Sequence, residues 1–558
     1  MTEAQARAPL LRFLGVAPGL RRKILLVSAA SGIANAMLLM VTNTAAVQGG
    51  GFFDLVMFIG LFTLYAIGFR ACFNQVTVVF EDAVERTRTR IAGKLRGLDL
   101  LGLNQLDSTT VYNRLTQQTA VISDAAGVLA ASLQSAALVV FTALYLASVS
   151  IPAFVLAVLL IGGGLLTYFH RAGEVNARMR EASAHEMAFF DSIGDLIGGF
   201  KELKLNYGRS AALATRIAEA ATAVRGLRIR TADLFNTNYI FAYSLFYALL
   251  GVLVFIGPQY QPSAGADIMR LTAIVLFVIG PTSTVVAGIP AWAKATLAAS
   301  EIAGLEDDLD RLARHPPLAS PPAPAPAFST IELRDVDFQY RGNAEKFEVG
   351  PLNLTINRGE ILFITGGNGS GKSTLLKLLC ALYHPDAGAI LVDGRTVRPD
   401  AVPSYRALFS AIFTDFYLFK TLDGADAIDP ATVDSLLQLM RIDTKTRFEG
   451  ERFSTLDLST GQRKRLALVV ALLENRPVMI FDEWAADQDP EFRRYFYEAL
   501  LPSLKSQGKT VIAVTHDEHY LHHADRLVKM EYGRIEPYHL PAATIATATT
   551  ATDGREET

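Results

Sequence analysis

The chain has 558 residues, which is too long for one ordinary domain. It is 51% hydrophobic and only 19% charged, with a mean hydropathy of +0.27, which excludes an ordinary soluble protein and indicates a large membrane part. The formal net charge of −3 gives no indication of nucleic-acid binding, and the distant Cys72 and Cys380 are expected to be buried free thiols rather than a disulfide.

The first half of the chain predicts about six membrane-spanning helices. A basic segment, 1–23, comes first and lacks the small-residue cleavage site of a signal peptide. Six apolar runs follow that are long enough to cross a bilayer: 24–47, 52–73, 127–149, 151–170, 234–256 and 268–291. We therefore expect a cytoplasmic segment over 1–23 and a transmembrane domain over 24–310.

The connections between these runs alternate in charge. The short ones contain no Lys or Arg, whereas the long ones, 75–126 and 171–233, are rich in both. This asymmetry predicts that the N-terminus and both long loops lie in the cytoplasm. The long loops lack Pro and are expected to be helical, with turns near 104–111 and 190–199. Such turns either contact a cytoplasmic domain or are ordinary helical hairpins.

Polar residues inside the spans have two interpretations. Intramembrane polar groups line a wet cavity or join helices to one another. Arg70 is the most costly of them to place in lipid, so it is the best single candidate for a cavity residue.

The second half of the chain has a different character. A Pro-rich stretch over 311–328 predicts a stiff linker, and alternating strand and helix patterns over 329–538 predict a soluble α/β domain. The Ala/Thr-rich and then charged end, 539–558, is expected to be disordered.

A glycine-rich loop in the α/β domain predicts a phosphate-binding site. It follows an apolar strand pattern, 360–365, and precedes a helix pattern, 375–379, which is the context of a Walker A loop. Backbone N–H groups and the helix N-terminus would hold phosphate oxygens, Lys372 would neutralise the β- and γ-phosphates, and the Ser373 hydroxyl would ligate Mg²⁺. The alternative is a glycine-rich turn without a ligand. The candidate residues are Gly366, Asn368, Gly369, Ser370, Gly371, Lys372, Ser373 and Thr374.

Further groups in the same domain suit nucleotide chemistry. The sequence Leu-Ser459-Thr-Gly461-Gln462 opens a helix pattern, which is a second anion site. A predicted strand ends in Asp482, which suits Mg²⁺, and Glu483, which suits a base that polarises the attacking water.

Two aromatic side chains complete the candidate site. His516 follows another apolar strand and is expected to reach the γ-phosphate, with a core histidine as the alternative. Tyr340 is expected to stack on adenine, with an ordinary strand aromatic as the alternative.

In this order, Walker A, LSTGQ, a strand ending in Asp-Glu and a downstream His resemble the nucleotide-binding domain of ABC transporters. With the preceding helices, the chain resembles an ABC exporter half-transporter. The stretches 409–419 and 481–490 are similar to those of bacterial exporters of cyclic peptides, peptide siderophores, lipopeptides and lasso peptides. The implied fold is a helical transmembrane domain fused to an α/β P-loop ABC nucleotide-binding domain.

The resemblance assigns three further positions. Asp489 matches the D-loop aspartate, and Thr460 replaces a glycine of the commoner LSGGQ form. Thr414 stands where most ABC domains have a glutamine that senses Mg²⁺. The resemblance implies either that Thr414 ligates the metal through its hydroxyl or that the neighbouring Asp415 takes part in metal binding.

The resemblance also implies partners, cofactors and a location. One Walker A and one LSTGQ imply a homodimer with two composite sites for ATP and Mg²⁺. The cargo is expected to be peptide-like and no nucleic acid is expected. The protein would be a multi-pass protein of the bacterial inner membrane with a cytoplasmic nucleotide-binding domain. Whether a periplasmic partner completes the export route is left open.

Other functions are also open at this point. A lipid or multidrug flippase is the alternative among transporters, and a non-transporting ABC membrane regulator is the alternative from another class. The six apolar runs disfavour a soluble ABC ATPase, and the order of the domains disfavours an importer.

Overall fold

The computed structural model describes residues 9–256, 265–313, 324–340, 347–423 and 428–536. The chain divides into two compact units. The helical unit comprises Met1–Arg96 and Leu106–Leu312, and the sheet unit comprises Gly97–Gln105 and Ala313–Thr558. The expected tail, 539–558, and the middle of the expected linker lie outside the described residues.

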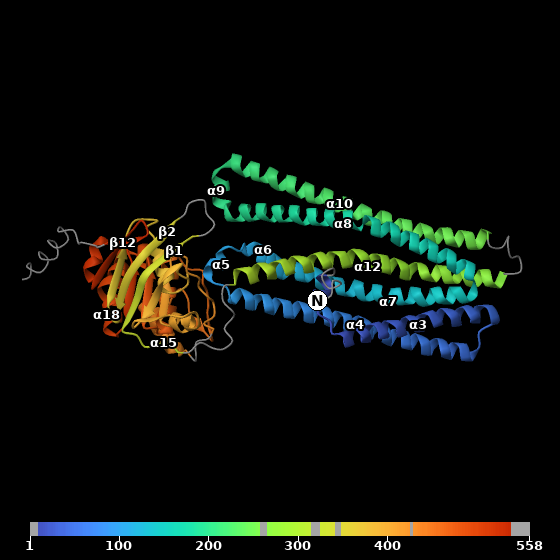
Figure 1. Cartoon of the computed structure of the whole chain (residues 1–558), viewed down its shortest axis with the longest axis horizontal. Helices are drawn as coiled ribbons and strands as arrows, with labels where there is room; N and C mark the ends of the chain where they lie inside the picture. Colours follow the sequence, from blue (N-terminus) through green and yellow to red (C-terminus); the bar gives the residue numbers. More distant parts are fainter. Residues whose placement is uncertain (1–8, 257–264, 314–323, 341–346, 424–427, 537–558) are drawn as a thin grey trace, which may run out of the picture. The chain divides into compact units, whose positions relative to one another are not determined.

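Long helices make up the helical unit and cover all six predicted apolar runs (Figure 1). After the short α2, Pro9–Leu14, they are α3 Pro18–Gln48, α4 Phe52–Arg96, α7 Thr119–Val149, α8 Ile151–Gly198, α10 Tyr207–Gly251 and α12 Gly265–Leu312. A π-helical segment, η2 Val252–Ile256, extends α10. Among the described residues, four helical stretches are long and apolar enough to cross a membrane: Pro18–Val47, Phe52–Arg96, Ser108–Val149 and Ile268–Leu312.

Two interruptions mark the turns of the long loops. The first holds α5 Leu100–Asn104, α6 Ser108–Asn113 and the π-helical segment η1 Arg114–Gln118. The second holds α9 Phe200–Leu205. It begins at Gly199, the last residue of the predicted range of 190–199, because α8 continues through the Asp and Ser residues there and ends at the glycine pair.

Packing in the helical unit is apolar toward one end and ionic toward the other. Leu39, Leu146, Leu249 and Ile274 belong to one buried cluster. Arg90 pairs with Glu306 at 2.6 Å and Lys94 with Asp310 at 2.8 Å, which joins α4 to the last turns of α12. Arg70 is exposed on α4.

The sheet unit contains a six-stranded and a four-stranded sheet. The first has the order β12 Arg534–Glu536, β11 Arg526–Glu531, β3 Ile361–Thr365, β10 Thr510–Val514, β9 Val478–Asp482, β6 Phe409–Ile412. Its neighbours from β11 to β6 are parallel, and β12 is antiparallel. The second is antiparallel, with the order β2 Glu348–Asn357, β1 Thr330–Gln339, β4 Ala387–Val392, β5 Arg395–Thr396.

Further elements of the sheet unit are short. The helices are α13 Lys372–Leu379, α14 Val402–Arg406, α15 Pro430–Leu439, α16 Thr460–Glu474, α17 Pro490–Tyr495 and α18 Leu501–Ser506. The shorter turns are η3 Pro399–Ala401, η4 Trp484–Asp487, η5 Phe496–Leu500 and η6 Glu518–His523. A hairpin of β7 Phe448–Glu449 and β8 Arg452–Phe453 completes the unit.

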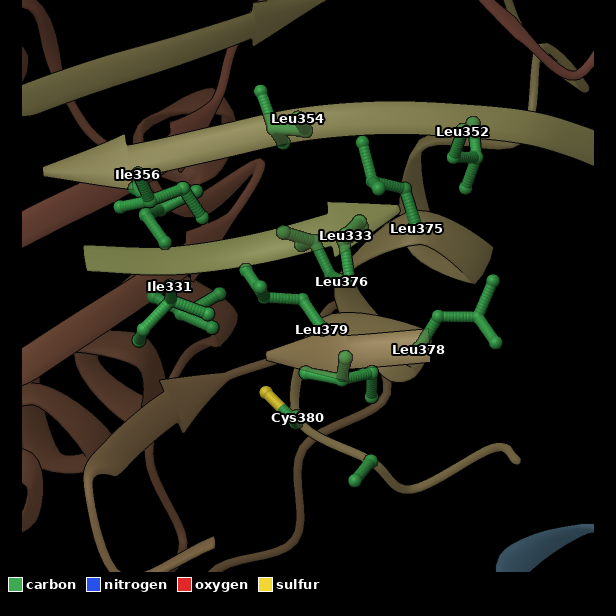
Figure 2. Close-up of a cluster of buried hydrophobic side chains, with 14 of the residues drawn as sticks. Ile331, Leu333, Leu352, Leu354, Ile356, Leu375, Leu376, Leu378, Leu379 and Cys380 are labelled. Carbon is green, nitrogen blue, oxygen red and sulfur yellow. The ribbon is translucent and has the colours of Figure 1, made fainter. Parts of the chain in front are cut away.

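Strand β3 is buried on both faces, as its unbroken apolar sequence predicts. Leu362 and Ile364 pack in one cluster with α13 and the four-stranded sheet, part of which Figure 2 shows. Ile361 and Phe363 pack in a second cluster with α16. This burial fixes the positions of the carboxyl ends of β3 and its neighbours. Both cysteines are free and buried, which confirms that prediction.

Helix α5 packs within the sheet unit, although it lies between two helices of the other unit in sequence. Leu100 and Leu101 pack against the cluster of α13. Asp99 Oδ1 lies 3.3 Å from His384 Nε2, which follows that helix. The first loop turn thus contacts the soluble domain a few residues before the predicted range of 104–111.

Candidate functional site

The loop that joins β3 to α13 has a backbone that only glycine can adopt at key positions. Gly366 has φ 146°, and a Cβ there would lie 2.2 Å from the carbonyl oxygen of Met530. Gly371, with φ 100°, precedes the first residue of α13. Glycine is therefore required at both positions. The loop runs from the carboxyl end of a buried strand to a helix N-terminus, where anions bind.

Lys372 is the buried cation of this loop. Its side chain is only 6% exposed, and Nζ donates to the carbonyl oxygens of Gly366 at 2.9 Å and Gly367 at 3.0 Å. Burial lowers the pKa of Lys372, while the charges of Glu483 and Asp482 act against that shift. The ammonium group is therefore held at the loop where a phosphate chain would lie.

Asp482 ends β9 and is 2% exposed. The Ser373 hydroxyl donates to its Oδ2 at 3.0 Å, and its Oδ1 has no hydrogen-bond partner in the described part of the chain. Burial is the main cause that raises the pKa of this carboxyl. A buried carboxylate with an unused oxygen beside a hydroxyl is a suitable ligand set for a hard divalent cation such as Mg²⁺.

Thr414 lies at the same strand end, because β6 pairs with β9. Its hydroxyl donates to the backbone carbonyl of Asp482 at 3.5 Å, and its side chain helps to hold the Asp482 carboxylate in the ionised form. Its hydroxyl thus lies beside Asp482, and the following Asp415 is exposed.

Glu483 and His516 are brought together from neighbouring strands. Glu483 turns out of β9 in a left-handed conformation with φ 51°. His516 follows β10, and its Nε2 lies 3.1 Å from Glu483 Oε1. The carboxylate is also 3.9 Å from Lys372 Nζ. These three side chains therefore converge at the carboxyl edge of the parallel sheet.

Lys464 also belongs to this site, and the sequence patterns did not identify it. It is 3% exposed, and its Nζ donates to the Glu483 carbonyl at 2.7 Å and pairs with Asp487 at 2.7 Å. Trp484 Nε1 donates to the carbonyl of Lys464 at 2.9 Å. This network holds the left-handed turn that aims Glu483. A basic residue on the apolar side of a helix pattern was the one available signal.

Tyr340 lies beside the phosphate loop. Its hydroxyl is 3.0 Å from Thr374 Oγ1, and its ring packs edge-on to Phe338 and Tyr383. Ser370 Oγ is buried, and none of the described residues hydrogen-bonds to it, whereas Asn368 is exposed at the loop tip. An unused buried hydroxyl in a loop of this shape fits a phosphate ligand.

The LSTGQ segment lies at a separate position. Ser459 and Gln462 form a reciprocal capping box at the start of α16, and Gly461 accepts from Gln488 Nε2 at 3.2 Å. Asp489 caps α17 and pairs with Arg465. No hydrogen bond or ion pair between described residues joins 459–462 to the phosphate loop of the same chain. The structure therefore brings together the phosphate loop, Asp482, Glu483 and His516, but not the LSTGQ segment.

Comparisons with known proteins identify the family of the chain. The family model described as ABC transporter matches residues 349–486. The chain is 33% identical over 473 residues to the ATP-binding protein SyrD of Pseudomonas syringae pv. syringae, which covers 80% of this chain and 82% of that protein.

Two further relatives differ in the cargo that their names give. The probable syringafactin export ATP-binding/permease protein SyfD of Pseudomonas syringae pv. syringae is 33% identical, over 37% of this chain and 33% of that protein. The ATP-dependent lipid A-core flippase of Paraburkholderia xenovorans is 24% identical, over 65% of this chain and 63% of that protein.

A solved structure shares the whole fold. The structure of a bacterial Atm1-family ABC exporter with ATP bound aligns with 95% of this chain and 99% of its own, with a TM-score of 0.72 and 19% identity. The helical domain and the sheet domain therefore follow each other in both chains in the same order.

Proposed function

The chain belongs to the ABC transporter family, and from that premise we propose that it exports a peptide-like cargo across the bacterial inner membrane as a homodimer. It is a membrane ABC exporter whose nucleotide-binding domain binds ATP, and hydrolysis of ATP is coupled to transport. The match to SyrD over most of both chains is the observation that carries the assignment to the family. The relative named for syringafactin export and the segments 409–419 and 481–490 support a peptide-like cargo over a lipid.

The proposed catalytic step uses side chains of the sheet edge. Glu483 polarises the attacking water, and His516 orients the Glu483 carboxylate through the 3.1 Å contact while it faces the γ-phosphate. Lys372 neutralises phosphate charge, and Tyr340 stacks on adenine. The phosphate loop supplies Gly366, Asn368, Gly369, Ser370, Gly371, Ser373 and Thr374.

Mg²⁺ fits the same edge. Ser373 and Asp482 would hold the ion, with Thr414 beside them in place of the usual glutamine. When bound, Mg²⁺ would neutralise charge on the β- and γ-phosphates. The unused Oδ1 of Asp482 supports this assignment.

A second copy of the chain would complete each ATP site. Ser459, Gly461 and Gln462 are not joined to the phosphate loop within the described chain, so the partner's LSTGQ segment would cover the nucleotide. Asp489 would lie at the same junction. ATP then stabilises the closed dimer, and its hydrolysis removes the differential affinity for that state. We propose that the nucleotide-binding domains and both long loops face the cytoplasm.

The test is the ATPase activity of the full chain in lipid nanodiscs, with Glu483→Gln as the blank. We would titrate cyclic peptides, lasso peptides, peptide siderophores and lipids. Saturable stimulation by one peptide class, and none by lipids, is the expected result. Stimulation by lipids alone would overturn the peptide assignment and favour a flippase, which the lipid A-core flippase relatives make the second candidate.

A further inference from the structure

A cavity of about 800 Å³ lies within the helical unit, between the pair α8 and α10 and the pair α7 and α12. These two pairs run alongside each other in Figure 1. The cavity is lined by residues 110–121 of α6, η1 and α7, 182–190 of α8, 228–235 of α10 and 294–301 of α12. We call it the hairpin pocket. Its volume is in the range of pockets that bind small molecules or part of a larger ligand.

The wall of the hairpin pocket that the end of α6 and η1 provide is rich in amides. Asn113, Gln117 and Gln118 line it, and the Oδ1 atom of Asn113 has no hydrogen-bond partner among the described residues. Its Nδ2 contacts only a weak acceptor, the sulfur of Met187, at 3.4 Å. Side-chain amides offer both donors and acceptors, which is what a peptide backbone requires. The π-helical turn η1, which carries Gln117 and Gln118 and directly follows Asn113, is a feature that recurs at functional sites.

Five charged side chains line the hairpin pocket, and among the described residues all but Lys294 have a partner; Glu301 of α12 is one of those that do. Glu186 and Arg228 join α8 to α10 at 2.5 Å, and Arg114 pairs with Asp308 at 3.7 Å. Lys294 of α12 is exposed on the pocket wall, and no hydrogen bond or ion pair is found for it among the described residues. An unpaired ammonium group in a pocket whose two carboxylates, Glu186 and Glu301, are already engaged favours a ligand that carries a carboxylate.

Apolar side chains also line the hairpin pocket. They are Val121, Met187, Phe190, Phe235, Leu297 and alanines of α8, α10 and α12. An acyl chain would leave the amides and the ammonium without partners, which is costly for polar groups that a ligand covers. A peptide segment can satisfy all three kinds of side chain.

We propose that the hairpin pocket binds the polar, carboxylate-bearing part of a peptide cargo, with Lys294 pairing with the carboxylate and Asn113 accepting from a peptide N–H. The proposal rests on the proposed function, because it names the chemistry of the cargo that this exporter takes. All four lining segments lie in stretches expected on the cytoplasmic side, except that 228–235 reaches the first residues of the expected span 234–256. The pocket would therefore act as the cargo approaches the membrane from the cytoplasm.

The experiment measures binding of two labelled cyclic heptapeptides to the full chain in nanodiscs without nucleotide, by fluorescence anisotropy. The peptides share one sequence except that a glutamate in the first is a lysine in the second. The expected result is that the wild type binds the glutamate peptide roughly tenfold more tightly, which corresponds to about 1.4 kcal/mol. Lys294→Glu reverses this preference.

The matched control is Arg225→Glu, which makes the same change of charge at an exposed site on α10 that does not line the pocket. It keeps the wild-type preference. An unchanged preference in Lys294→Glu, an equal shift in both variants, or no binding of either peptide to the wild type would overturn the proposal. Elution of each variant as a single peak shows that it has folded.

The ATPase assay separates this proposal from the proposed function. If peptides stimulate the wild-type ATPase but Lys294→Glu binds both heptapeptides as the wild type does, export of peptides stands and the pocket assignment fails. If no peptide stimulates the wild type, the cargo class itself is wrong.

Discussion

The sheet unit and the helical unit both hold polar groups, but they hold them in opposite ways. Lys372, Asp482 and Lys464 are almost completely buried, and each is fixed by short contacts at the edge of a parallel sheet. In the hairpin pocket, Lys294 is exposed and the side chain of Arg228 is 64% exposed. A buried ionic site is already organised for one reaction, whereas an exposed one is able to adapt to a ligand. Substitutions should therefore lower the rate of ATP hydrolysis in the sheet unit and change the specificity for cargo in the helical unit.

The largest effect is expected for Glu483→Gln. Because the amide cannot polarise water, ATP turnover should fall by about 10²- to 10⁴-fold while ATP binding is kept. The variant should trap the closed dimer in the presence of ATP, which size-exclusion chromatography or crosslinking would detect. Substantial turnover by the variant would refute the assignment of Glu483 as the base.

Asp482→Asn should separate activity from stability. The variant should lose ATPase activity, yet without nucleotide the sheet unit should unfold about 2–4 °C higher, because a buried charge costing about 1 kcal/mol is removed. Differential scanning fluorimetry would measure this shift. The matched control is Asp489→Asn. Asp489 is exposed and accepts a hydrogen bond from the Phe492 amide, so removal of its negative charge should not raise the melting temperature.

The pH dependence of this effect has a definite sign. Burial raises the pKa of Asp482 above its ordinary value of 3.8, so the folded state binds this proton more tightly than the unfolded state does. The wild type therefore loses stability relative to Asp482→Asn as the pH rises from 3.8 through the raised pKa, and the difference stays constant above it. A difference in melting temperature that grows in acid would contradict this explanation.

Much of the sheet unit was predictable because its signals are local. The phosphate loop needs glycine at positive φ. Asp482 ends a buried strand, and Glu483 and His516 follow buried strands, so sequence alone placed them at one edge. Lys464 was not predictable, because its partner Glu483 is 19 residues away and the contact depends on how α16 packs on the sheet.

The helical unit was less predictable in detail. Apolar runs located all six long helices, but the predicted range for the second turn, 190–199, meets the turn only at its last residue, because α8 continues to the glycine pair. They also did not place α5 in the sheet unit, because Leu100 and Leu101 pack against residues more than 200 positions away in the chain. The hairpin pocket arises from four segments of the chain that are distant in sequence, and no single motif marks it.

The smallest effects are expected at the two loop turns. Like the two units, one turn is packed against a core and the other is exposed. Leu101 of α5 is half-buried against the core of the sheet unit, whereas Leu205 of α9 is 90% exposed. Leu101→Ala should speed amide hydrogen exchange over 97–105 by roughly tenfold in nucleotide-free protein, because it removes about 1.4 kcal/mol of apolar contact. Leu205→Ala, the matched change, should leave exchange over 199–206 as it is in the wild type, because its side chain has almost no contact to lose within the chain. Equal effects at both turns would mean that α9 is also covered in the free protein, and the contrast between a docked and an open turn would fail.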